Sequence, residues 1–309
     1  MKKHSDLYFL IFFLIFTTSC TEITAQKILA EESFNLARVK SLLVKGKFCN
    51  IELNGTAGSN LKMEGYIKGS GDPDKYEIKY EERDGHVEVW IESPSSVWGN
   101  IQSLLRFEIP GNVRLEVDNS SGNLSIYKVT TDRINLKTSS GNIETEDTKA
   151  ELRIRCSSGN VTVEDQFGEL WVTTTSGNIK IKDLTGDAEF NATSGNINLD
   201  NVAGSIFARC SSGNITMDRI NGKLNTETSS GNIKGDEIML QGDSEFRATS
   251  GNIRIDLLNP EDDLSFNLEA GSGNLRAAEN SGEDNMIIKR GDISIRGISS
   301  SGNQTYITR

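Results

Sequence analysis

The feature that most constrains this chain is a three-residue phrase, Ser-Gly-Asn, that recurs nine times with an apolar residue behind it. Successive serines of the phrase lie 19 residues apart, then 18 residues apart five times, then 20 and 22. A fixed period of this kind is the signature of an architecture in which repeats stack on one another. The serines are Ser121, Ser140, Ser158, Ser176, Ser194, Ser212, Ser230, Ser250 and Ser272.

Each repeat contains two stretches in which apolar and polar residues alternate. In the repeat that begins at Ser176, the apolar positions are Ile179 and Ile181, then Ala188, Phe190 and Ala192. Alternation with a period of two is typical of strands, whereas a helix would space its apolar residues by three or four. Each repeat is therefore predicted to form two short strands, joined by the Ser-Gly-Asn corner and by a looser polar turn.

Two topologies fit this pattern, a solenoid with parallel coils or an antiparallel meander. A meander would leave one apolar face that needs a second layer, and the rest of the chain supplies none. We therefore expect an all-β fold, a parallel β-solenoid with about 18 residues per coil, in which Ile179, Ile197 and Ile215 form a row of nearest neighbours. The corner asparagines are expected to stack in a hydrogen-bonded ladder.

The N-terminus reads as an export signal. Residues 1–19 combine two lysines with a ten-residue apolar run from Leu7 to Phe16, which is too short to span a bilayer. The following residues predict lipidation at Cys20, although Thr17 stands where a lipobox usually has leucine. Cleavage after Ala25 is the alternative. We expect an exported lipoprotein of the outer membrane or cell surface, or else a periplasmic or secreted soluble protein, that touches membrane only through this anchor.

The remaining chain divides into a linker (20–29), a strand-rich region without the period (30–118) and the repeats (119–309). The region 30–118 is expected to form an irregular β cap over the first coil, and Asp84-Gly85 predicts a hairpin within it. No polar cap is evident at the C-terminal end, which makes end-to-end self-association an expected property. Cys49, Cys156 and Cys210 are expected to be free and buried, because the last two stand three coils, about 14 Å, apart.

One outward row of the predicted solenoid is acidic. It contains Glu146, Glu164, Asp200 and Asp218, is interrupted by Lys182, and continues through Asp236 and Asp256. Carboxylates at one-coil spacing repel one another, and calcium would relieve that repulsion. The glycine-rich signature of calcium-loaded β-rolls is absent, so a solvated acidic face without any cofactor is the preferred interpretation. Glu146, Glu164, Asp200 and Asp218 are the candidate cation site.

The other outward face carries two aromatic side chains, Trp171 and Phe207, two coils or about 10 Å apart, with Arg153 and Arg209 near them. Aromatic and arginine side chains on a rigid surface suit stacking on carbohydrate or docking of an envelope protein. Single exposed apolar residues are also common on soluble proteins, so this patch is a candidate binding surface only. The net charge of −11 excludes nucleic acid as a natural partner.

Serial Ser-Gly-Asn-Ile repeats behind a lipoprotein-like signal resemble the bacterial β-strand-repeat adhesins, including the adhesin-head type. The resemblance covers residues 30 to 309 and implies a β-solenoid at the cell envelope with no established catalytic residues. The leading hypothesis is a non-enzymatic adhesin-like protein that binds carbohydrate or an envelope protein. A polysaccharide-cleaving β-helix enzyme and a purely structural spacer are the alternatives, and the single histidine of the exported chain, His86, argues against a catalytic triad.

Overall fold

The computed structural model describes residues 27–95 and 100–308, and in this part of the chain the fold is all-β, as predicted. Its helical segments are two single 3-10 turns, η1 (Pro73–Lys75) and η2 (Glu261–Asp263). Within the described ranges no helix has the length and apolarity needed to cross a membrane.

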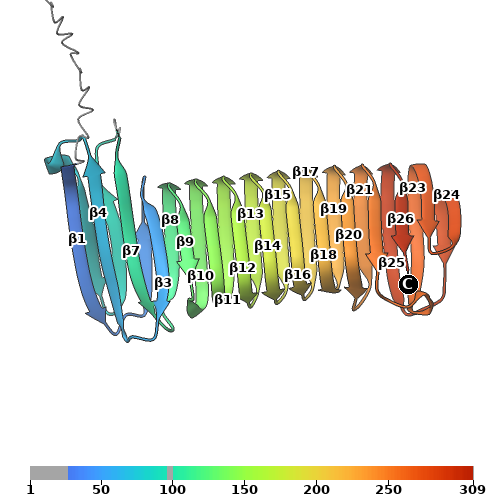
Figure 1. Cartoon of the computed structure of the whole chain (residues 1–309), viewed down its shortest axis with the longest axis horizontal. Coiled ribbons are helices and arrows are strands. Elements are labelled where there is room, and N and C mark those ends of the chain that lie inside the picture. The colour runs from blue at the N-terminus through green and yellow to red at the C-terminus, as the bar shows by residue number, and fades with distance from the viewer. Residues whose placement is uncertain (1–26, 96–99, 309) are drawn as a thin grey trace, which may run out of the picture.

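The strands fall into three groups along the chain (Figure 1). The N-terminal strands are β1 (Lys27–Ala37), β2 (Ser41–Lys45), β3 (Asn50–Thr56), β4 (Asn60–Gly69), β5 (Glu77–Arg83), β6 (His86–Glu92), β7 (Gln102–Pro110), β8 (Arg114–Ser121) and β9 (Leu124–Tyr127). The central strands are β10 (Thr130–Ser140), β11 (Ile143–Ser158), β12 (Val161–Phe167), β13 (Leu170–Ser176), β14 (Ile179–Thr185), β15 (Ala188–Ser194), β16 (Ile197–Ala203), β17 (Ile206–Ser212), β18 (Ile215–Gly222), β19 (Leu224–Ser230), β20 (Ile233–Leu240), β21 (Ser244–Ser250) and β22 (Ile253–Leu257). The C-terminal strands are β23 (Leu264–Ala277), β24 (Asn280–Ile288), β25 (Ile293–Ser301) and β26 (Gln304–Ile307).

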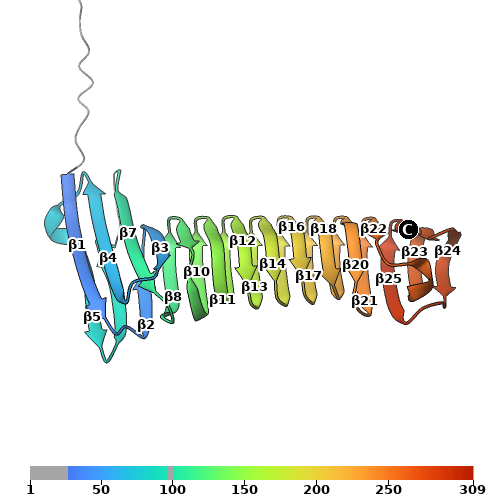
Figure 2. The ribbon, with the colours of Figure 1, turned by 60° about the horizontal axis from the view of Figure 1, so that its bottom comes forward.

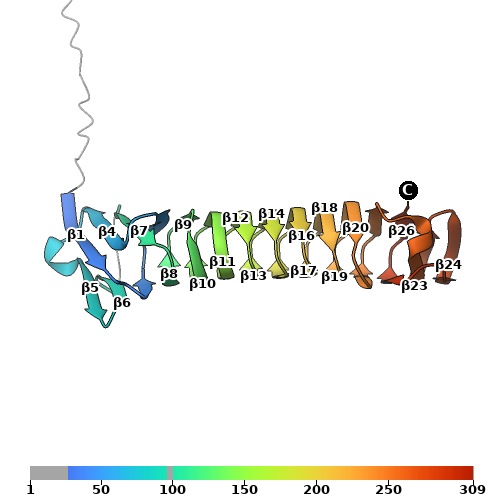
Figure 3. The ribbon, with the colours of Figure 1, turned by 90° about the horizontal axis from the view of Figure 1, so that it is seen from below.

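The strands are hydrogen-bonded into one 26-stranded sheet, which coils around a long axis and so has two facing layers, called here the first and the second sheet (Figures 2 and 3). The first sheet contains β12, β14, β16, β18 and β20 as parallel neighbours, and the second contains β13, β15, β17, β19 and β21. The alternating apolar residues of both sheets point between them and form one continuous core. The coils therefore bury their apolar surface against themselves, and no further layer is needed.

The register of pairing follows the sequence repeat. Ile179 pairs with Ile197, and Ile197 pairs with Ile215, so the expected row is present. All three side chains are fully buried. Because neighbouring strands lie about 4.8 Å apart, residues that are equivalent in sequence form straight rows along the stack.

The Ser-Gly-Asn corners stack as well. The backbone N–H of Asn160 donates to Oδ1 of Asn142 at 2.9 Å, and Asn178 and Asn196 continue the same pattern at 2.9 Å. The ladder was predicted, but its rungs run mainly from backbone amide to side chain rather than between side chains. It also begins earlier than the repeats, at Asn50, whose Oδ1 accepts from the backbone of Asn123.

The second corner turns at a glycine, such as Gly168 with φ 114°, and an additional bend that the sequence analysis did not expect lies inside the strand that precedes it. A single residue in the left-handed conformation, such as Asp165 with φ 51°, bends the strand, and the next residue points back into the core. Gln166 occupies that inward position in one coil, and Leu184 and Val202 occupy it in the following two. The sequence interpretation missed this additional core row because the bend residues are aspartate, asparagine, arginine or glutamate and not glycine.

The N-terminal strands close one end of the stack. β1 and β4 pair antiparallel, as do β4 with β7 and β5 with β6, whereas β2 and β3 join the parallel rows through β8 and β9. Asp84 and Gly85 form the predicted hairpin between β5 and β6. The expected boundary at residue 118 falls inside β8, and the hydrophobic core runs through both sides of it.

The C-terminal end departs from the expected order. The last strands in sequence, β25 and β26, lie between β21–β22 and β23, so the terminal coil is inserted into the stack and not added at its end. The strand β24 then pairs antiparallel with β23 and covers the last coil with exposed polar residues, among them Glu283 and Asp284. The same strand exposes Ile287 and, within the described residues, pairs only with β23, so end-to-end self-association stays a prediction.

Candidate functional site

The parallel register brings the predicted aromatic residues onto one row of the second sheet. Arg153 on β11 pairs with Trp171 on β13, which pairs with Glu189 on β15, which pairs with Phe207 on β17. The guanidinium carbon of Arg153 lies 4.2 Å from the centroid of the Trp171 ring, in a cation–π contact. Arg153 and Trp171 are adjacent along the stack, so the guanidinium packs against the indole ring, which is the first wall of the site.

A hollow of about 420 Å³ opens beside that wall. We call it the aromatic slot; it is lined by Trp171, Phe207, Glu189, Asp187, Lys223 and Asn225, with Ala188, Ser205 and Ile206 completing it. Both aromatic residues are half-buried. Arg153 packs on the indole of Trp171, which also lines the slot. Glu189 stands midway between the two aromatic walls, which are two coil spacings, about 9.6 Å, apart.

The four predicted patch residues therefore have different roles. Trp171 and Phe207 form the walls, and Arg153 supports one wall while also pairing with Glu151 at 2.8 Å. Arg209 pairs with Glu227 at 2.6 Å and does not line the slot. Sequence reasoning placed Glu189 in the row but did not identify it as the residue between the walls. The signal was available, because the strand register alone sets Glu189 between Trp171 and Phe207.

The acidic row is formed as expected but is partly neutralised. Glu146 pairs in register with Glu164, and Asp200 with Asp218. Arg219, at the left-handed bend, forms ion pairs with both Asp200 and Asp218. Lys180 lies 3.5 Å from Glu164. In residues 27–95 and 100–308, no three His, Cys, Asp or Glu side chains are placed to hold a metal ion. The calcium hypothesis gains no support from this geometry.

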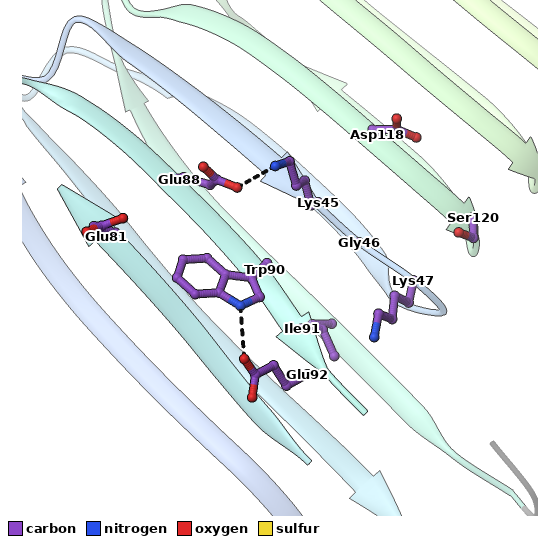
Figure 4. A pocket seen from close by; sticks show the side chains of 10 residues that line it. All are labelled: Lys45, Gly46, Lys47, Glu81, Glu88, Trp90, Ile91, Glu92, Asp118 and Ser120. Carbon is purple, nitrogen blue, oxygen red and sulfur yellow. Dashed lines mark hydrogen bonds and ion pairs between the residues drawn. The ribbon is translucent and has the colours of Figure 1, made fainter. Parts of the chain in front are cut away.

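A second hollow, of about 590 Å³, lies on the N-terminal strands of the same sheet (Figure 4). Trp90 stands in it between charged residues of β2 and β6. Lys45 pairs with Glu88 at 2.6 Å, and the indole Nε1 of Trp90 donates to Glu92 at 3.5 Å. Hydrogen bonds from Lys79 and then from Trp90 hold the pKa of Glu92 below its usual range. Sequence reasoning missed this hollow because its residues come from separate parts of the chain.

The predicted lipidation site, Cys20, lies outside the described residues, as do the signal segment and most of the linker. Cys49, Cys156 and Cys210 are free and buried, as predicted. Burial raises the pKa of the Cys49 thiol to about 12, and it also raises the pKa values of Cys156 and Cys210. A thiol with a raised pKa is a poor nucleophile at neutral pH, so these three residues serve the core.

Two arrangements bear on catalysis. His86 Nδ1 and Ser41 Oγ share a hydrogen bond of 2.7 Å, but both side chains are on the surface and neither lines the hollows described above. Glu151 accepts hydrogen bonds from Arg133 and Arg153, which lower the pKa of its carboxyl group. A general acid for glycoside cleavage needs the opposite shift. Glu151 thus lies beside Arg133 and Arg153 on this face, in ion pairs at the surface.

Comparison with known proteins identifies related folds. A family model described as Toastrack DUF4097 matches residues 50–220 and 146–305. The solved structures that resemble the chain include a putative adhesin from Parabacteroides distasonis ATCC 8503, at 13% identity over 89% of this chain and 95% of that one, with a TM-score of 0.44. Another is a putative adhesin from Bacteroides fragilis NCTC 9343, at 13% identity over 89% and 96%, with a TM-score of 0.34. A third, a putative lipid binding protein from Parabacteroides distasonis ATCC 8503, is 14% identical over 90% and 94%, with a TM-score of 0.26. No curated protein matches.

Proposed function

The chain belongs to the Toastrack DUF4097 family, and we propose that it is a non-enzymatic, adhesin-like protein that binds carbohydrate at the cell envelope. The stack of coils is a rigid scaffold, and the aromatic slot is the recognition site on it. We also propose that the fold is a parallel β-solenoid with coils of about 18 residues.

The observation that carries this proposal is the pair of aromatic walls on one row. The flat face of a sugar ring presents C–H groups that pack on aromatic side chains, while its hydroxyl groups bond to neighbouring polar residues. Trp171 and Phe207 offer two such walls, and Glu189 and Asn225 supply polar groups beside them. A spacer would have no use for a hollow of this composition.

We favour the aromatic slot over the hollow at Trp90 as the binding site because the slot contains a carboxylate without an ion-pair partner in the described chain. At Trp90 every lining carboxylate has a basic partner: Glu88 pairs with Lys45, Glu92 with Lys79, Glu81 with Arg83 and Asp118 with Lys137. In the slot, Glu189 has one partner within the described chain, the side-chain amide of Asn191 at 2.7 Å. Unmatched polar groups beside an aromatic wall are what a ligand can use.

The proposal places the protein outside the cytoplasm, held to a membrane through lipid on Cys20. The scaffold would then stand away from the membrane and present the slot to polysaccharide of the envelope or of a neighbouring cell. Metabolic labelling with radioactive palmitate tests the anchor. Absence of label from a protein that is exported and intact would refute it.

The binding proposal is tested with a glycan array and a pull-down from envelope extract. The purified protein is compared with a Trp171→Ala, Phe207→Ala double variant, and with Phe167→Ala as a matched control. Phe167 is 57% exposed and does not line the slot. We expect glycan binding by the protein and the control and none by the double variant. Equal signals from all three would refute the slot as the binding site. Capture of an envelope protein without any glycan signal would replace carbohydrate with a protein partner, and glycan cleavage would support the enzyme alternative.

A further inference from the structure

The charges around the aromatic slot specify what it recognises more closely than its aromatic walls do. The two rows that flank the slot are the aromatic row, Arg153 to Glu245, and its neighbour, Arg155 to Arg247. In these rows Glu227 pairs with Arg209 at 2.6 Å, and Glu245 pairs with Arg247 at 2.8 Å. Glu189 has no ion pair within the described part of the chain, although arginines stand on both sides of it along the stack.

The reason is geometric. Arg153 is drawn to the indole face and to Glu151, and Arg209 extends toward Glu227 on the next coil. Both cations are thereby held away from the carboxylate between the walls. The other charges of the lining, Asp187 and Lys223, are of opposite sign and offset one another, so Glu189 sets the net charge of the slot. The slot is therefore anionic.

The spacing of the walls fits a positive charge. A group centred above Glu189 lies one coil spacing, about 4.8 Å, from the row position of each aromatic wall. A cation is attracted by an aromatic face when it lies within about 6 Å of the ring centroid, a range that is longer than this coil spacing. A flat neutral ring stacked at about 3.5–4.0 Å from one wall would leave the other wall out of contact.

We propose that the aromatic slot recognises amino sugars, with the protonated amino group held between Trp171 and Phe207 above the Glu189 carboxylate. This inference rests on the proposed carbohydrate-binding function and names the class of sugar. The charged amine is the distinguishing element, because N-acetylation removes the charge while it preserves the sugar ring and its linkage. Salt is expected to weaken the interaction, since both attractions are electrostatic at a partly solvated site.

The experiment compares three probes by isothermal titration calorimetry: the β-1,4-linked tetramers of glucosamine, N-acetylglucosamine and glucose. We expect the protein to bind the glucosamine tetramer at least about tenfold more tightly than the other two, the size expected for a charge-assisted contact. Glu189→Gln keeps the shape of the side chain and is expected to abolish that preference. The matched control, Glu283→Gln, removes an exposed carboxylate on β24, outside the slot and without a part in the ion pairs around it, and is expected to retain the preference. Circular dichroism verifies that both variants are folded.

The outcomes separate this inference from the function on which it rests. Equal binding of all three tetramers, lost in the Trp171→Ala, Phe207→Ala variant, would overturn the amino-sugar preference and leave carbohydrate binding at the slot in place. A preference for the amine that survives in Glu189→Gln would also overturn it, because general attraction to an acidic protein would then explain the result. Failure of every tetramer, together with a silent glycan array, would overturn both proposals.

Discussion

Replacing Gly177 with alanine tests the central physical argument, that the corners stack too closely to admit a side chain. Gly177 has φ +147°, a conformation that only glycine adopts without strain. A Cβ there would overlap the carbonyl oxygen of Gly159 on the preceding coil and lie 2.7 Å from its carbonyl carbon. That carbonyl belongs to the backbone of a neighbouring corner, so it has little room to move away.

The expected cost has two parts. Strain at this backbone position contributes about 1–3 kcal/mol. Separating the two corners also weakens the backbone hydrogen bond between them, from Gly159 N–H to the Ser176 carbonyl at 3.1 Å, which is worth about 1 kcal/mol. Gly177→Ala is therefore expected to lower the free energy of unfolding by about 2–4 kcal/mol, a large share of the 5–15 kcal/mol that is typical of proteins.

The assay is urea denaturation followed by circular dichroism and by tryptophan fluorescence, since Trp171 lies on the strand that leads into this corner. Gly242→Ala is the matched control, because a Cβ at Gly242 meets nothing within 4 Å. We expect the control to leave the unfolding midpoint nearly unchanged. If the two variants unfolded at the same urea concentration, the close stacking of the corners would be refuted as a determinant of stability.

Three further predictions concern the core, the surface charges and the thiols. Phe190→Ala should lower the free energy of unfolding by about 3–5 kcal/mol in the same urea assay, because Phe190 is fully buried. Phe207→Ala should lower it much less, because Phe207 is half-buried on the outer face. Similar losses in the two variants would contradict the assignment of inner and outer faces. Glu151→Gln should lower the melting temperature at neutral pH. Arg133 and Arg153 depress the pKa of this carboxyl group in the folded state. The stability that it contributes is therefore complete above the unfolded pKa of about 4.3 and is lost as the pH falls through the lower folded pKa. A difference in melting temperature between the variant and the unmodified protein that persisted well below pH 4 would contradict this reasoning. Finally, the thiol of Cys49 should react with iodoacetamide at pH 8 only after denaturation, since burial raises its pKa to about 12; mass spectrometry that found rapid alkylation in the native protein would show that the site is open.

The repeat was enough to predict which residues are neighbours. Once Ile179, Ile197 and Ile215 occupy one row, every other row follows, because parallel strands in constant register carry equivalent positions side by side. For the same reason Trp171, Glu189 and Phe207 were placed on one outward line. The family resemblance, drawn from the same repeats, is confirmed by the family match over residues 50–220 and 146–305.

The predictions failed where the answer depends on which charge a flexible side chain reaches. Arg219 neutralises two carboxylates of the acidic row, yet its position in sequence falls in what reads as a turn. The hollow at Trp90 is lined by residues of β2, β5, β6 and β8, and no sequence repeat indicates that these strands pair. Such contacts follow from the path of the side chains and from non-local pairing, and neither has a sequence period.

The sequence by itself determined the all-β class, the rows and the stacked corners, because a constant repeat allows only one register that buries every apolar position. Tertiary structure decided the two ends and the site. It inserted the C-terminal strands β25 and β26 between β21 and β23 and ended the stack with the antiparallel strand β24, since any strand of suitable length can pair with the backbone groups of an open coil. It also drew Arg153 and Arg209 away from Glu189, which is what gives the aromatic slot its charge.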